Sequence, residues 1–119
     1  MFRIKDRQIT SVEPLVYLPM TEGEAYALGE ALTMGETAAK CAAAERPTHI
    51  CAGEATAKGL PAIPVLATTR FEAEYTEKPA IGAAVQLHTD GLQVTAAEGG
   101  AFTVATVDEE AKTATGYFR

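Results

Sequence analysis

The chain aligns with itself without a gap when it is shifted by 53 residues (82 − 29). Apolar positions of residues 24–66 fall on apolar positions of residues 77–119, so the alternation of apolar and polar residues is matched. Several identities are alanine on alanine, which an alanine-rich chain gives by chance, and chance resemblance is the alternative to duplication. The more informative pairs are Glu24 with Glu77, Leu28 with Ile81, Gly29 with Gly82, Leu32 with Val85, Met34 with Leu87, Cys41 with Val94, His49 with Phe102, Cys51 with Val104 and Val65 with Phe118. The alignment predicts two copies of one structural unit.

The second copy has the pattern of short β-strands. Val85 and Leu87 alternate with polar residues, and Asp90-Gly91 is a strong tight-turn signal before the next alternating segment. The first copy contains an alanine-rich stretch, residues 36–45, whose intrinsic propensity favours a helix. Gly29 and Gly35 interrupt the wider alanine-rich stretch, residues 22–46, each at a cost of about 1 kcal/mol within a helix. The repeat predicts strands there. We therefore expect both copies to be β structure.

Turn signals divide the chain into short segments, because ten Gly and six Pro are spread along it. The expected strands are Val12–Tyr17, Glu30–Met34, Ala39–Ala42, Thr48–Gly53, Ile63–Ala67, Phe71–Tyr75, Ala83–Leu87, Leu92–Thr95, Phe102–Val107 and Thr113–Phe118. Residues 1–10 are expected to form a flexible arm. Residues 11–119 are expected to form a single domain, with residues 54–61 and 108–112 as connecting loops. Ten short strands in two similar halves predict an all-β fold, a small barrel or sandwich.

Composition limits the classes of function. The chain has 119 residues, which suits one domain, and its formal net charge is −6. An acidic chain without a long basic tract is a poor candidate for binding nucleic acid. No uninterrupted apolar run reaches the roughly 18 residues of a membrane span, and residues 1–7 lack the apolar segment of a signal peptide. We therefore expect a cytosolic protein that binds neither nucleic acid nor membrane.

Cys41, His49 and Cys51 have the side chains that a zinc site would use. Their spacing matches no standard zinc finger, and a fourth ligand is not evident from the sequence. The repeat places Cys41 opposite Val94 and Cys51 opposite Val104, which are ordinary core residues, and free cysteine behaves as a small buried hydrophobe. We expect core packing without a metal or other cofactor. A zinc site and a cross-strand disulfide are the alternatives.

His88 and Asp90 have the residue types of a general base and its orienting carboxylate. They flank Thr89 just before Gly91, in a predicted hairpin turn that itself explains the aspartate. No Ser or Cys nucleophile is identifiable near them, so we expect a turn rather than a catalytic pair. Gly99-Gly100 lacks the Lys and Ser/Thr of a phosphate-binding loop and is also expected to be a turn. With no catalytic set recognised, we expect a protein that is not an enzyme.

Acidic residues are dense in two segments of the chain. The spaced Asp, Asn and Gly residues of a calcium-binding loop are absent from both, so we expect solvated faces or loops rather than a metal site. The acidic residues in question are Glu22, Glu24, Glu30, Glu36, Asp108, Glu109 and Glu110.

The first residues of the chain carry a basic cluster, Arg3, Lys5 and Arg7, beside Asp6. Because the remainder of the chain is acidic, this arm is a candidate for docking on an acidic partner surface. Plain disorder of a chain terminus is the alternative. These three residues are the only partner-binding residues that the sequence predicts.

Several segments together resemble the small β-rich proteins encoded next to the major capsid protein in tailed phages and prophages. The segments are Gly29-Glu30-Ala31-Leu32, Lys40-Cys41-Ala42, residues 46–54, Ile63-Pro64-Val65, residues 81–87 and residues 90–95. The resemblance covers roughly residues 12 to 118 and consists of hairpin patterns. It implies a head-decoration or capsid-stabilising role, and an oligomer, commonly a trimer. It defines no residue-level binding motif.

We therefore expect a structural phage or prophage protein that binds the major capsid protein or a similar assembly. It would be present in the host cytoplasm and then in the virion. The alternatives are a β-barrel that binds a small molecule and an enzyme whose site forms only between subunits. A binding barrel requires a sizeable apolar pocket with a few convergent polar groups.

Overall fold

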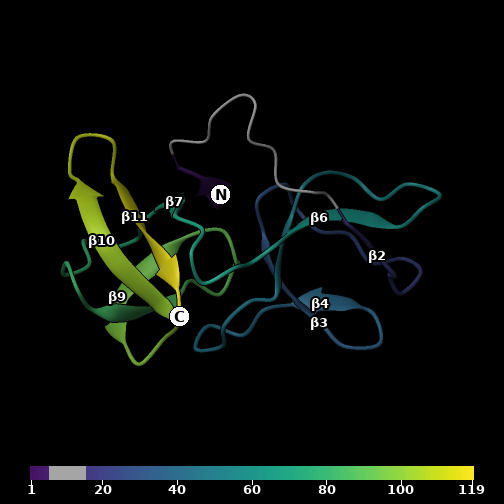
Figure 1. Ribbon diagram of the computed structural model, residues 1–119, viewed down its shortest axis with the longest axis horizontal. Coiled ribbons are helices and arrows are strands. Elements are labelled where there is room, and N and C mark those ends of the chain that lie inside the picture. Colours follow the sequence, from purple (N-terminus) through teal and green to yellow (C-terminus); the bar gives the residue numbers. More distant parts are fainter. Residues whose placement is uncertain (6–15) are drawn as a thin grey trace.

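The computed structural model describes residues 1–5 and 16–119, which form eleven β-strands in two antiparallel sheets (Figure 1). Within the described residues, no helix is long and apolar enough to cross a membrane. The strands are β1 (Arg3–Ile4), β2 (Val16–Leu18), β3 (Ala31–Met34), β4 (Ala38–Lys40), β5 (His49–Cys51), β6 (Leu60–Pro64), β7 (Phe71–Glu74), β8 (Ala84–Leu87), β9 (Val94–Glu98), β10 (Phe102–Asp108) and β11 (Thr113–Phe118). The expected all-β fold is confirmed.

The two sheets have the same strand order. The first half forms a sheet in the order β2-β6-β5-β3-β4, and the second half forms β7-β11-β10-β8-β9, with β1 added at its edge. Each strand of one sheet therefore has its counterpart at the same place in the other. Hydrogen bonds repeat as well: the N–H of Gly29 donates to the carbonyl of Cys51 at 2.8 Å, and the N–H of Gly82 donates to that of Val104 at 2.8 Å. The expected two similar halves are present.

Each half curls until the two strands at the ends of its sheet order approach one another. These strands are β2 and β4 in the first half, and β7 and β9 in the second. In the first half, the N–H of Ala38, where β4 begins, donates to the carbonyl of Pro19, just after β2, at 2.8 Å. In the second half, the N–H of Thr76, just after β7, donates to the carbonyl of Val94, where β9 begins, at 2.9 Å. The halves are thus two small, partly closed barrels that lie side by side along the molecule (Figure 1).

Two hydrophobic clusters fill the barrels, and one of them joins the halves. The smaller cluster lies within the first half and includes Leu32 and Cys51. The larger cluster fills the second half and takes in residues from the outer face of the first. Its buried members are Phe2, Ala31, Cys41, Ile50, Val65, Phe71, Ala73, Val85, Leu87, Val94, Phe102, Val104, Ala114 and Phe118. The shared core holds the two barrels together as one unit.

Backbone hydrogen bonds also cross between the halves. The N–H of Ala31 donates to the carbonyl of Gly91 at 2.8 Å, and the N–H of Leu87 donates to the carbonyl of Ala43 at 2.8 Å. The turn after β8 therefore packs directly on the start of β3.

Among the described residues, β6 and β9 begin two or more residues from the expected start, and other strands are shifted by a single residue. The sixth strand begins at Leu60, directly after Gly59, and includes Pro61, which was expected in a loop. The carbonyl of Pro61 accepts a hydrogen bond from the N–H of Ala52 at 2.9 Å. The strand needs no N–H donor at this position, so it accommodates the proline. The ninth strand begins at Val94 rather than Leu92, because the preceding turn is longer than the tight turn expected. Of the expected strand Val12–Tyr17, residues 12–15 lie outside the described residues.

The expectation of a flexible arm is wrong for residues 1–5. Arg3 and Ile4 form β1, which pairs with Glu72 and Phe71 of β7. Phe2 is only 2% exposed, and its N–H donates to the carbonyl of Gly29 in the first half at 2.9 Å. The segment therefore contacts both halves. Residues 6–10 of the expected arm lie outside the described residues.

Candidate functional site

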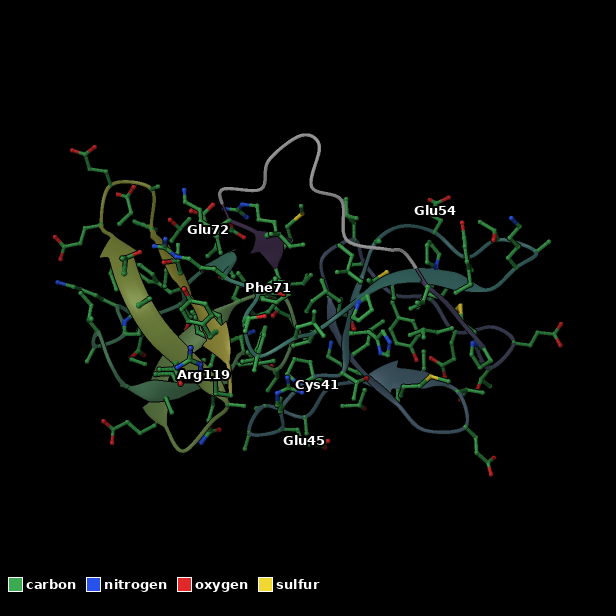
Figure 2. The ribbon with its side chains drawn as sticks, viewed as in Figure 1. Cys41, Glu45, Glu54, Phe71, Glu72 and Arg119 are labelled. Atoms are coloured by element: carbon green, nitrogen blue, oxygen red, sulfur yellow. The ribbon has the colours of Figure 1, made fainter. Side chains whose placement is uncertain are left out.

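The two cysteines lie in different hydrophobic clusters, and neither forms a disulfide. Cys41 is at the junction of the halves (Figure 2). Its thiol donates to the carbonyls of Ala42 at 3.3 Å and Glu45 at 3.4 Å. Burial, helped by the charge of Glu45, raises the pKa of the Cys41 thiol to about 11. This cysteine is a protonated core residue near neutral pH, and its nucleophilic thiolate form is suppressed.

Cys51 and His49 likewise have structural partners. The thiol of Cys51 donates to the carbonyl of Gly53 at 3.2 Å, and burial raises its pKa. The Nδ1 atom of His49 lies 2.9 Å from the hydroxyl oxygen of Thr48, and burial lowers the pKa of His49. Across residues 1–5 and 16–119, no three His, Cys, Asp or Glu side chains are grouped so as to hold a metal ion.

Replacing Cys51 with valine is expected to change the free energy of unfolding by no more than about 1.5 kcal/mol, as for other swaps that nearly conserve volume. The residue at the equivalent place in the second half is Val104, also buried. Chemical denaturation of the two proteins measures the difference. Cys51→Asp is the contrasting variant, because it buries a carboxylate, and it is expected to cost several times more. Equal losses for valine and aspartate would contradict a core role for this thiol.

His88 and Asp90 form a turn, as expected. One carboxylate oxygen of Asp90 accepts the N–H of Leu92 at 2.8 Å, and the other accepts the side-chain amide of Gln93 at 3.1 Å. The Nδ1 atom of His88 lies 3.2 Å from the Asp90 carboxylate. Burial opposes ionisation of Asp90, but these hydrogen bonds outweigh it, and its pKa is lowered. The carboxylate thus closes the turn and delays the start of β9 to Val94.

One acidic residue departs from the expected solvated position. The side chain of Glu30 is buried, with the residue only 7% exposed. Its carboxylate accepts the N–H of Ala27 at 3.1 Å and lies 3.8 Å from the Nζ atom of Lys40. Glu30 precedes Ala31, whose N–H reaches across to Gly91. The buried carboxylate therefore supports the loop at the junction of the halves.

The basic residues predicted to bind a partner are used within the fold. Arg3 forms ion pairs with Glu72 at 2.9 Å and Glu74 at 2.8 Å, and Lys5 forms one with Glu72 at 3.2 Å. Both glutamates lie on β7, and Figure 2 labels Glu72 beside β1. Burial opposes the ionisation of Glu74, but the N-terminal amino group and Arg3 outweigh it and lower its pKa. Arg7 lies outside the described residues.

A surface cleft of about 300 Å³ opens in the first half, between the loop before β3 and the segment joining β5 to β6. Its walls are largely apolar, and carboxylates of Glu24 and Glu54 stand among them. Figure 2 labels Glu54 at the upper side of the first half. The lining residues are Met20, Glu24, Ala25, Tyr26, Glu54, Ala55 and Leu60. The hydroxyl of Tyr26 donates to the carbonyl of Ala38 at 3.0 Å, which fixes one wall.

A second cleft, of about 440 Å³, opens at the equivalent place in the second half. It lies between the loop before β8 and the end of β10, and is lined by Lys78, Pro79, Ala80, Ile81 and Val107. Ala25, Tyr26 and Glu54 of the first cleft have repeat equivalents in the second. These equivalents, 53 residues further along the chain, are Lys78, Pro79 and Val107. The same pair of segments therefore forms a cleft in each half.

A turn in each half exposes a large apolar side chain, and of the two only Ile81 lines a cleft. Leu28 is 54% exposed and Ile81 is 68% exposed, and these two residues are equivalent in the repeat. Each directly precedes a glycine with positive φ, Gly29 at 81° and Gly82 at 88°, and this sharp turn directs the preceding side chain outward. The sequence shows both residues as matched apolar positions, and alternation alone does not reveal that they face solvent.

No family model matches the sequence, and comparison with curated proteins and with solved structures finds no match.

Proposed function

We propose that the chain is a structural protein of a phage or prophage, and that it decorates or stabilises the capsid. The observation that carries the proposal is the exposure of an equivalent apolar residue, Leu28 or Ile81, in each half of a duplicated fold. Single exposed apolar residues are common on protein surfaces. These two stand at the same place in both copies, and we take them as the contact points for a partner.

The shared core supports this proposal, because it fixes the spacing of the two exposed residues. Ile50 and Val65, on the outer face of the first half, are buried against the second half. A rigid unit with repeated contact points suits a partner that is itself built from identical subunits, as a capsid is. The resemblance of the hairpin segments to capsid-associated proteins points to the same partner and to an oligomer, possibly a trimer.

The proposed role assigns no catalytic, cofactor or metal residue to the chain. It also changes the contact surface from that expected from the sequence. Arg3 and Lys5 are paired with glutamates of β7, so docking is assigned to the surface around the two exposed apolar residues instead. The proposed location is the host cytoplasm, followed by the virion.

Co-sedimentation tests the proposal with heads assembled from the major capsid protein encoded beside this chain. The full-length protein is expected to sediment with the heads, and heads of an unrelated phage serve as the control. Failure to bind, or absence of a neighbouring capsid gene, would overturn the proposal. In that case the small-molecule alternative is favoured, because clefts of about 300 and 440 Å³ have the volume of ligand pockets.

A further inference from the structure

We infer that the first cleft, between the loop before β3 and the segment joining β5 to β6, receives one arginine side chain from the partner protein. This inference rests on the proposed function, under which the partner is a capsid subunit, and it adds one defined contact to the surface already assigned. It concerns the first half alone, because the cleft in the second half has a different chemistry.

The charge of the first cleft is not balanced within the chain. Glu24 and Glu54 line the cleft and are exposed, and no lysine or arginine belongs to the lining. Among the residues that the structure describes, neither carboxylate forms an ion pair. Lys58, on the same segment as Glu54, instead has its Nζ atom 5.7 Å from the ring centroid of Tyr17. The cleft therefore complements a cation brought by a partner, which its charge would steer and orient.

The other walls of the cleft suit the aliphatic part of a long basic side chain. Ala25 and Ala55 are exposed, and Met20 is half-buried. Leu60 is already buried, so it forms part of the support rather than new contact surface. An arginine lays its aliphatic stem along such a surface and keeps its charged head near water. A volume of about 300 Å³ is at the small end of the range for ligand pockets, which suits one side chain rather than a longer segment.

Tyr26 favours a guanidinium over an ammonium. Its hydroxyl donates to the carbonyl of Ala38 at 3.0 Å, which holds the ring in the cleft wall. Burial, together with the charges of Glu24 and Glu30, raises the pKa of this phenol, so the ring stays neutral. A planar guanidinium stacks on an aromatic ring and donates to carboxylates through a rigid fork, whereas the ammonium of lysine is compact and more strongly hydrated. The occupant is therefore an arginine.

The second cleft provides a comparison within the same molecule. Val107 stands there at the place of Glu54, and its lining contains no acid. Lys78 stands at the place of Ala25 and forms an ion pair with Glu109. A cleft with its own lysine and no lining carboxylate does not complement a second cation, so we expect the second cleft to leave arginine unbound.

Titration of the full-length protein, followed by nuclear magnetic resonance, tests the site directly. The probes are Nα-acetyl-arginine amide, the corresponding lysine compound, and the corresponding citrulline compound, which keeps the shape of arginine without its charge. The arginine probe is expected to shift the backbone amide signals of Ala25 and Ala55 at millimolar concentration, and to leave those of Ala80 and Ile81 in the second cleft unchanged. We expect lysine to bind about two- to fivefold more weakly, as for the loss of an exposed stacking contact, and citrulline not to bind.

Matched variants identify the carboxylates that hold the probe. Glu24→Gln and Glu54→Gln keep the size of exposed side chains, so folding is unaffected. Each is expected to weaken binding of the arginine probe by about two- to fivefold, the effect typical of one exposed ion pair, and the double variant is expected to abolish it. Glu22→Gln is the control, because Glu22 is an exposed acid of the same loop that does not line the cleft. The same order of effects is expected for co-sedimentation with heads assembled from the neighbouring capsid protein.

The outcomes separate this inference from the proposed function. If citrulline shifts the same signals as arginine, if lysine binds as tightly as arginine, or if no probe shifts them, the arginine site is wrong. If the heads bind the unchanged protein and the double variant equally, the inference is likewise wrong while the proposed function stands. If the unchanged protein does not bind the heads, both are overturned.

Discussion

Replacing Phe2 with alanine is expected to lower the free energy of unfolding by about 3–5 kcal/mol, the range typical of a buried phenylalanine. The ring of Phe2 packs with its centroid 6.0 Å from that of Phe102 and 5.4 Å from that of Phe118. Its loss leaves a cavity in the cluster that joins the two halves. Because small domains are stable by only about 5–15 kcal/mol, this one change removes a large part of the total.

Urea denaturation of the two proteins measures the effect, and Phe2→Leu is the matched control. Leucine keeps most of the apolar volume and the position of β1, so its loss should be less than half that of alanine. A further comparison is Tyr17→Ala, which truncates an aromatic ring that is largely exposed. If Phe2→Ala and Tyr17→Ala have equal denaturation midpoints, the start of the chain does not belong to the core.

The burial of Phe2 also shows where sequence reasoning failed at the first strand. Phe2 and Ile4 alternate with Arg3 and Lys5, which is the pattern of a half-buried strand. A segment this short gives too few alternations to distinguish from chance, and the basic residues favoured an arm. Their partners, Glu72 and Glu74, are about 70 residues away in the sequence, and only the folded chain brings them together.

The repeat was the most informative feature of the sequence, because it carried the clear pattern of the second copy over to the ambiguous first copy. Residues 36–45 have the propensity of a helix, yet Ala38–Lys40 form β4. Tertiary context outweighs intrinsic propensity here, as it commonly does. The strand order and the bonds of Gly29 and Gly82 confirm that both copies fold alike.

The candidate docking surface was not predictable in the same way. The sequence shows that Leu28 and Ile81 are apolar, and it shows the turn glycines that follow them. Whether the side chain then faces the core or the solvent depends on how the loop before β3 or β8 crosses the barrel, which is set by distant contacts. Glu30 is the reverse case, because a charged residue in an acidic segment is buried at the junction of the halves.

The two halves also differ in the register of β10 against β11, and this difference identifies a glycine that the fold requires. Cys51 pairs with Ala62 in the first half, so the repeat would pair Val104 with residue 115. Val104 pairs instead with Gly116, one residue further along β11. A Cβ atom at Gly116 would lie 2.1 Å from the carbonyl oxygen of Thr103 and 3.0 Å from the ring of Phe102. The close approach of β10 to β11 therefore requires a residue without a side chain at position 116.

Replacing Gly116 with alanine is expected to lower the free energy of unfolding by about 3 kcal/mol or more, at the upper end of the cost of overpacking a core. The clash is with backbone, so rotation of a side chain cannot relieve it, and β10 and β11 must separate. Gly35→Ala is the matched control, because the nearest atom to its added Cβ is 4.0 Å away. That change should be neutral or stabilising by up to about 1 kcal/mol. Thermal and urea denaturation of both variants measure the difference, and equal stabilities would show that β11 is not packed against Phe102 as described.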